Sequence, residues 1–256
     1  MIYFLFRHHH NYPDMRRLAA KIGAKVLIKR GIAYQLDGKK QHVQFFDDIA
    51  VRWGGRFRVP IPTINSPEAV CLIAHKSRAR EVLQGKVPVP KTWWRVEDAQ
   101  YPCIARPSQH SGGSNFIVLN NENDLGKLRK KNLNGWYFSE LLEKKSEWRI
   151  YTGHGKVLGS YKKELVEDEI RANRAITRSQ KWEFIEHPPE DIGQIAVDAC
   201  RVVDIDTSGV DVLVTQSGDP KIIELNSTPT VSSPEVEKMY EKYFLEFSKN
   251  GHSLPL

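Results

Sequence analysis

Two carboxylates and one amide within residues 209–229 have the spacing of a metal site. Strand-forming runs on both sides of the turn-forming stretch Gln-Ser-Gly-Asp-Pro predict a β-hairpin. A turn centred on the Ser-Gly step places Asp211 directly opposite Glu224, and Asn226 shares their face because side chains alternate along a strand. Facing carboxylates repel each other, whereas Mg²⁺ prefers carboxylate and amide oxygens. The pattern therefore predicts a divalent-cation site, with a solvated acidic hairpin face as the alternative.

The opposite face of this hairpin is apolar. The same register places Val210 opposite Leu225 and Val212 opposite Ile223, so this face is expected to pack in a core. An amphipathic helix predicted over residues 189–203 leads the chain into the hairpin.

A second stretch, residues 101–119, has residue types suited to binding phosphate. Two apolar, strand-like pieces bracket Arg106 and a run of small residues, Ser111, Gly112, Gly113 and Ser114. The backbone N–H groups of such a loop, next to a fixed cation, can hold a phosphate. A plain hairpin turn is the alternative.

The composition is that of a soluble globular protein with an anionic partner. The chain has 256 residues, enough for one large domain or two to three small ones, and a net charge of +7. No apolar run is long enough to span a membrane, and three cysteines without a CxxC motif favour reduced thiols in the cytoplasm. Lysine and arginine are spread along the chain without alternating aromatic residues, which argues against a nucleic-acid partner.

The elements around these stretches predict an α/β protein. Residues 1–66 have the order strand, helix, strand, with the helix over residues 13–22, and this order favours parallel strands. A single helix is expected over residues 68–84, with Ser66 as its N-cap and Pro67 as its first residue. The polar segment 164–180 lacks periodicity and is expected to be a functional loop.

Together, residues 68–229 resemble the ATP-grasp superfamily of carboxylate–amine ligases, and in particular the glutamate-tail and D-alanine–D-alanine ligase branches. The family's magnesium element, an Asp followed by Glu-x-Asn, is matched by Asp211, Glu224 and Asn226. The resemblance implies an ATP-grasp fold in which two small sheet-bearing lobes clamp ATP after a short N-terminal α/β unit. The implied divisions are 1–66 for that unit, 67–100 for a connecting helix and strand, 101–139 for the small lobe and 140–256 for the C-terminal lobe.

The resemblance also implies a set of nucleotide contacts. The segment HKSRAREVLQGKVPVPKTW is similar to the family's Lys-led helix and Val-Pro-x-Thr strand, RPSQHSGGSNF to its Gly-rich phosphate loop, and FSELLEKKSEWRI to its adenine hinge and ribose carboxylate. The residues implied are Lys76, Arg106, Ser111, Gly112, Gly113, Ser114, Glu140, Leu141, Leu142 and Glu147. Arg106 stands where the family usually has Lys, and His110 and Asn115 stand where glycines are usual, so this loop is expected to differ from its relatives.

The implied chemistry is ligation through an acyl phosphate. The segment IRANR resembles the family's Arg-x-Asn, which gives Arg171 and Asn173 roles beside the transferred phosphate, with Arg149 as a third catalytic residue. The cofactors implied are ATP and Mg²⁺, with Mn²⁺ as an alternative. The substrates implied are a carboxylate from an amino acid, peptide or protein tail and an amine. A kinase, or a nucleotide- or nucleic-acid-binding module without turnover, is the alternative on the same fold. Either Lys162 or Lys163, but not both, can face the site, because adjacent strand residues point to opposite faces.

Overall fold

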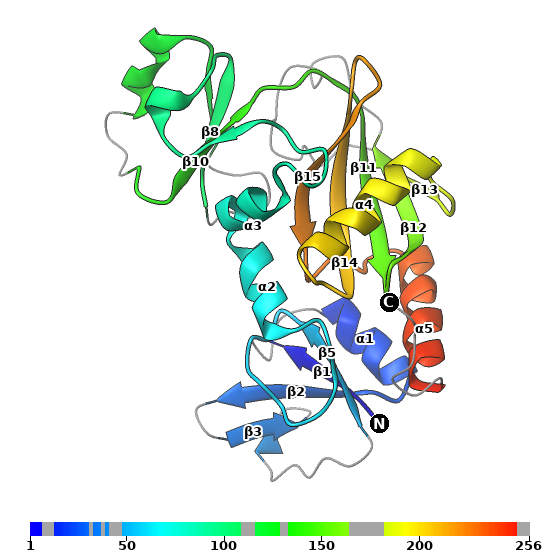
Figure 1. Ribbon diagram of the computed structural model, residues 1–256. Helices are drawn as coiled ribbons and strands as arrows, with labels where there is room; N and C mark the ends of the chain where they lie inside the picture. The colour runs from blue at the N-terminus through cyan, green and yellow to red at the C-terminus, as the bar shows by residue number, and fades with distance from the viewer. Residues whose placement is uncertain are drawn as a thin grey trace.

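The computed structural model describes most of the chain, namely residues 1–6, 13–30, 33–36, 39–40, 48–108, 116–128, 133–163 and 182–249. The described strands form three sheets, one in each of three regions that are separate in Figure 1. No helix in these ranges is long and apolar enough to cross a membrane.

The N-terminal unit is built on a six-stranded sheet. Its strand order is β4 (Lys39–Lys40), β3 (Ala33–Leu36), β2 (Lys25–Arg30), β1 (Ile2–Phe6), β5 (Ile49–Trp53) and β6 (Thr63–Ile64). Helix α1 (Pro13–Lys21) connects β1 to β2, and these two strands are parallel as the sequence predicts. The C-terminal helix α5 (Pro234–Lys249) shares a core with α1, β1 and β5, so the two ends of the described chain stabilise each other.

The small lobe is a four-stranded sheet that projects at the upper left of Figure 1. Its strand order is β7 (Thr92–Trp93), β10 (Trp136–Glu140), β8 (Cys103–Pro107) and β9 (Ile117–Leu119), with the short 3₁₀ helices η1 (Val96–Asp98) and η2 (Glu122–Leu128) beside it. In η2 the side chain of Asp124 accepts a bond from the amide of Asn120, at 2.7 Å, and Asn121 accepts one from Asn123, at 3.0 Å. Such local side-chain bonds favour short turns over a regular α-helix.

The large lobe is a five-stranded sheet. Its strand order is β13 (Trp182–Ile185), β12 (Lys156–Lys163), β11 (Lys144–Gly153), β14 (Thr207–Thr215) and β15 (Pro220–Asn226). Helix α4 (Glu190–Val202) lies across one face of this sheet (Figure 1), where Trp148, Ile150 and Val210 pack against Ala196 and Cys200. The polar residues of the sheet are therefore directed to the face away from α4.

The connection between the N-terminal unit and the small lobe is two helices, and the expectation of one helix over residues 68–84 is wrong. Helix α2 (Pro67–Ala74) begins with the predicted cap, because the Ser66 hydroxyl accepts the amide of Ala69 at 3.0 Å. The backbone at His75 then leaves the helical region, with φ −96° and ψ 91°, and α3 (Lys76–Leu83) begins. The amide of Lys76 donates to the carbonyl of Ser108 at 2.9 Å, so a bond to the small lobe replaces a helical bond at this break.

The hairpin β14–β15 has the predicted pairing at its polar face and a different pairing nearer the turn. Asp211 is opposite Glu224 and Val210 is opposite Leu225, as predicted, but Val212 is opposite Ile222 rather than Ile223. A β-bulge between Asp211 and Val212 causes this difference, because two residues of one strand then oppose one residue of the other.

Candidate functional site

A row of side chains crosses the polar face of the large sheet. Each member is paired in register with the next, in the order Phe184, Tyr161, Arg149, Asp211 and Glu224. Directly paired residues of antiparallel strands have neighbouring side chains. The row therefore runs from aromatic residues, through a cation, to two acids.

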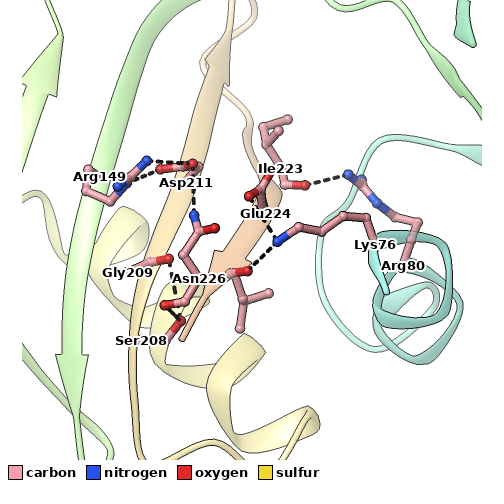
Figure 2. Close-up of polar contacts among 10 residues, drawn as sticks. Lys76, Arg80, Arg149, Ser208, Gly209, Asp211, Ile223, Glu224 and Asn226 are labelled. Carbon is pink, nitrogen blue, oxygen red and sulfur yellow. Dashed lines mark hydrogen bonds and ion pairs between the residues drawn. The ribbon is translucent and has the colours of Figure 1, made fainter. Parts of the chain in front are cut away.

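The central contact of the row joins Arg149 to Asp211 (Figure 2). The guanidinium bonds both carboxylate oxygens, with Nη2 at 2.9 Å from Oδ2 and Nε bonded to Oδ1. Burial alone would lower the pKa of Arg149, but the charge of Asp211 raises it above its ordinary value. The amide of Asn226 donates to the same Asp211 carboxylate at 3.4 Å, so these three residues form one connected group.

The second acid of the row is paired with a cation from the connecting helices. Lys76 Nζ lies 2.9 Å from Glu224 Oε1 and donates to the carbonyl of Leu225 at 2.9 Å (Figure 2). One helical turn later, Arg80 donates to the carbonyl of Ile223 at 2.7 Å and to that of Ile222 at 3.3 Å. Because Lys76 and Arg80 have i,i+4 spacing, they lie on one face of α3 and bind the edge of β15 together.

Asp211, Glu224 and Asn226 form a donor set that fits a magnesium ion. Their oxygens are of the hard carboxylate and amide type that Mg²⁺ accepts, and in this structure Arg149 and Lys76 neutralise the two carboxylates. The described residues include no group of three His, Cys, Asp or Glu side chains suited to a metal. The third oxygen donor beside the two carboxylates is the side-chain amide of Asn226.

Glu147 lies on the same face of the large sheet as the row, two residues before Arg149 on β11. Its Oε2 is 3.2 Å from Lys144 Nζ and 3.3 Å from Lys163 Nζ, and both lysines are buried. Burial would raise the pKa of Glu147, but the charges of the two lysines lower it below its ordinary value. Lys162 points to the other face, with its Nζ 5.6 Å from the ring centre of Trp148, so Lys163 is the lysine that faces the site.

A cavity between the two lobes holds several of the expected nucleotide residues. Arg106, Glu140 and Leu142 from the small lobe line it together with Arg80 and Leu213. The Nε of Arg106 is buried and has no hydrogen-bond partner among the described residues. An unpartnered buried guanidinium nitrogen is costly, which suits a site where an anionic ligand binds.

The hinge after β10 is bonded to its neighbours through its backbone and through the side chain of Glu140. The amide of Glu140 donates to the carbonyl of Lys91 at 3.0 Å, and its carboxylate accepts the amide of Lys91 at 2.8 Å. The amide of Leu141 donates to the carbonyl of Pro102 at 3.3 Å. These bonds fix the position of the hinge at the edge of the cavity.

The structure brings most of the described site residues into two groups. Lys76, Arg149, Asp211, Glu224 and Asn226 meet at the large sheet. Arg106, Glu140 and Leu142 line the cavity between the lobes. The residues of the expected set that lie outside the described ranges are Ser111, Gly112, Gly113, Ser114, Arg171 and Asn173.

Arg80 and an aromatic group next to Arg149, namely Tyr151, Tyr161 and Trp182, are site residues that were not predicted from the sequence. The i,i+4 spacing from Lys76 could have identified Arg80. The alternation of β11 could have placed Tyr151 beside Arg149. No sequence signal pointed to Trp182, because strand β13 was not predicted.

The chain is similar to known proteins in sequence and in fold. Residues 89–242 match the RimK-like ATP-grasp domain. No curated protein sequence matches the chain significantly. Many solved structures share its fold, and the macrocyclase MdnC from Microcystis aeruginosa MRC, bound with the precursor peptide MdnA, is one of them. Its TM-score is 0.65 at 13% identity, over 95% of this chain and 99% of that chain.

Two further structures contain nucleotide and peptide. A RiPP-associated ATP-grasp ligase from Chryseobacterium gregarium, in complex with ADP and a leader and core peptide, has a TM-score of 0.63 at 16% identity, over 96% of each chain. The ATP-grasp ligase PsnB, complexed with a phosphomimetic variant of its minimal precursor, Mg and ADP, also has a TM-score of 0.63 at 16% identity, over 90% of this chain and 91% of that chain. These similarities confirm the predicted ATP-grasp fold. The chain belongs to the RimK-like ATP-grasp domain family.

Proposed function

We propose that the protein is an ATP- and magnesium-dependent ligase that joins a carboxylate to an amine through an acyl phosphate. The observation that carries the proposal is the pair of neighbouring acids on the large sheet, in which Asp211 is paired with Arg149 and Glu224 is paired with Lys76 of α3. Phosphoryl transfer requires mainly positioning and charge neutralisation. Two acids for a metal, with a cation on either side for phosphate oxygens, supply both.

The nucleotide is proposed to bind in the cavity between the lobes. Arg106, with its unpartnered Nε, and Lys76 are the proposed phosphate ligands, together with Ser111, Gly112, Gly113 and Ser114. Glu140, Leu141 and Leu142 are proposed to hold adenine. Glu147 is proposed to accept the ribose hydroxyls, because its lowered pKa keeps it ionised and a carboxylate is a strong acceptor.

Asp211, Glu224 and Asn226 are the proposed magnesium ligands, and the ion would neutralise charge on the phosphate oxygens. Mn²⁺, which has similar ligand preferences, is the proposed substitute. In the first step a substrate carboxylate oxygen bonds to the γ-phosphorus, and the bond from that phosphorus to the β-phosphate oxygen breaks, which releases ADP. In the second step the amine nitrogen bonds to the acyl carbon and loses a proton, and inorganic phosphate leaves. Arg149 is proposed to hold the carboxylate and to stabilise the charge that develops on it, assisted by Arg171 and Asn173.

The proposed carboxylate belongs to a peptide or a protein tail. Structural relatives that span nearly the whole chain contain precursor peptides, which supports this substrate class. The amine is proposed to be an amino group of a peptide or an amino acid. A cytoplasmic location is proposed on the three cysteines, which are all free thiols, because such thiols are typical of reducing compartments.

The test is a single substitution at the proposed metal site. Glu224→Gln should lower ADP release on the order of 100-fold in mixtures of ATP, Mg²⁺, candidate peptides and pooled amino acids, because one charge-stabilising oxygen is lost. Glu183→Gln makes the same chemical change at an exposed position on β13 and is the matched control. Circular dichroism would verify that both variants are folded.

Mass spectrometry of the same mixtures identifies the reaction class. The proposal expects an amide product whose formation depends on the amine. A phosphorylated product that forms equally well without any amine would refute ligation in favour of a kinase. Unchanged turnover in Glu224→Gln would refute the metal site.

A further inference from the structure

A cavity of about 480 Å³ adjoins the charged row on the side away from Lys76. Arg149 is part of its lining, and Tyr151, Tyr161 and Trp182 contribute aromatic rings. Three hydroxyl residues between positions 230 and 233 complete the polar part of the lining. Its volume lies within the range of typical small-ligand sites, roughly 300–1,000 Å³.

This space is the aromatic cavity. We propose that the aromatic cavity binds the carboxylate substrate, and that this substrate has an aromatic side chain next to its reacting carboxylate. The inference rests on the proposed ligase function and specifies its substrate. Of the residues that line the cavity and are described in the structure, Arg149 is the only cation. A carboxylate held at Arg149 lies next to Asp211 and the proposed magnesium ligands, and the rest of its molecule then extends into the aromatic cavity.

The aromatic rings of the cavity are fixed in position by their own packing. Tyr151 contacts Tyr161 edge to face, with ring centres 6.4 Å apart, and Tyr240 below it at 5.9 Å. Tyr161 contacts Phe184 in the same geometry at 5.4 Å. Edge-to-face and offset stacking between aromatic rings is favourable beyond simple burial. A prearranged aromatic wall therefore selects an aromatic ring on the ligand with little loss of side-chain entropy.

The hydroxyl side of the aromatic cavity is also fixed. Tyr161 donates its hydroxyl to Ser233 at 2.5 Å and lies 3.3 Å from a carboxylate oxygen of Glu235. Tyr151 donates to the carbonyl of Thr230 at 3.3 Å. These bonds hold the segment after β15 against the rings, so the width of the cavity is set by the folded protein.

Charge decides against a basic side chain in the aromatic cavity. Aromatic faces also attract cations, but a buried cation needs an acidic partner. The described residues that line the aromatic cavity include no Asp or Glu. A neutral aromatic side chain is therefore the better fit.

The experiment compares the binding of three carboxylates to the intact protein by calorimetry. The probes are N-acetyl-phenylalanine, N-acetyl-cyclohexylalanine, which has a similar size without aromaticity, and N-acetyl-alanine. Each is titrated in the presence of Mg²⁺ and a non-hydrolysable ATP analogue, whose own binding is measured first. We expect the phenylalanine probe to bind about fivefold more tightly than the cyclohexylalanine probe, and more tightly still than the alanine probe.

Two variants complete the test. Trp182→Ala, at an edge-strand position where the side chain is 37% exposed, should remove most of the preference for the phenylalanine probe. Trp94→Ala makes the same change at a residue that is 41% exposed and follows β7 in the small lobe, and it should leave the preference unchanged. If the analogue binds but the three probes bind equally or not at all, the inference is wrong and the proposed function stands. If the analogue itself does not bind, the proposed function fails.

Discussion

Lys76→Met should make the protein bind Mg²⁺ more tightly when no nucleotide is present. Lys76 Nζ lies 2.9 Å from Glu224 and 2.9 Å from the carbonyl of Leu225, so an ammonium group occupies the position beside a proposed metal ligand. Methionine has nearly the same length and no charge. The substitution therefore removes a competitor of the metal ion while it preserves most of the packing.

The size of the effect follows from the ion pair. Two unit charges at 2.9 Å attract by about 6 kcal/mol with an effective dielectric constant of about 20. The side chains of Lys76 and Glu224 are 13% and 21% exposed, and desolvation offsets most of this attraction, which leaves about 1.5 kcal/mol for a charged hydrogen bond. That free energy corresponds to about a tenfold increase in Mg²⁺ affinity.

Calorimetric titration with Mg²⁺, without nucleotide, measures the change directly. Lys86→Met, an exposed lysine that follows α3, provides the control for loss of one positive charge. Binding of ATP with Mg²⁺ should change in the opposite direction in Lys76→Met, because a phosphate ligand is lost. Equal or weaker Mg²⁺ binding by a folded Lys76→Met protein would refute the argument that Lys76 competes with the metal.

Two further predictions concern stability. Asn65 has φ +65°, and its side chain exchanges bonds of 3.0 and 2.9 Å with the backbone of Thr207, so Asn65→Ala should lower the free energy of unfolding by about 2–4 kcal/mol, measured by urea denaturation. A loss below about 0.5 kcal/mol, the size expected at an ordinary surface position, would contradict it. The charges of Lys144 and Lys163 hold the pKa of Glu147 in the folded protein below its ordinary value of 4.5. The ionised carboxylate therefore stabilises the folded protein above pH 4.5, and this stabilisation is lost as the pH falls through the folded pKa. The melting temperature of Glu147→Gln should therefore fall less steeply than that of the wild type below pH 4.5, and parallel curves would refute this.

The site hairpin shows what the sequence could predict and what it could not. The alternation of polar and apolar residues is a local property, so it correctly placed Asp211 and Glu224 on one face and Val210 on the other. The bulge beside Asp211 depends on how β15 fits against its neighbours, including the bond from the amide of Ile222 to the carbonyl of Pro88. Such a contact between distant segments has no pattern in the sequence.

The break between α2 and α3 shows the same limit. Residues 68–84 have helical composition throughout, and the bond from the amide of Lys76 to Ser108, where the helix breaks, joins distant segments of the chain. The ion pairs of Lys76 with Glu224, Arg149 with Asp211 and Glu147 with Lys163 are also tertiary. The family resemblance names candidate residues for the site, but it does not say which cation pairs with which acid.

The same break makes Lys76 a mechanical link between the two lobes. Its backbone is bonded to the small lobe at Ser108, where the hydroxyl of Ser108 also donates to Ser77 at 2.6 Å, and its side chain is bonded to Glu224 of the large lobe. The lobes cannot separate at this point unless one of these attachments breaks. Because Lys76 and Arg80 also bond the backbone of β15, any movement that separates α3 from β15 breaks the ion pair at Glu224 and uncovers the proposed metal ligand.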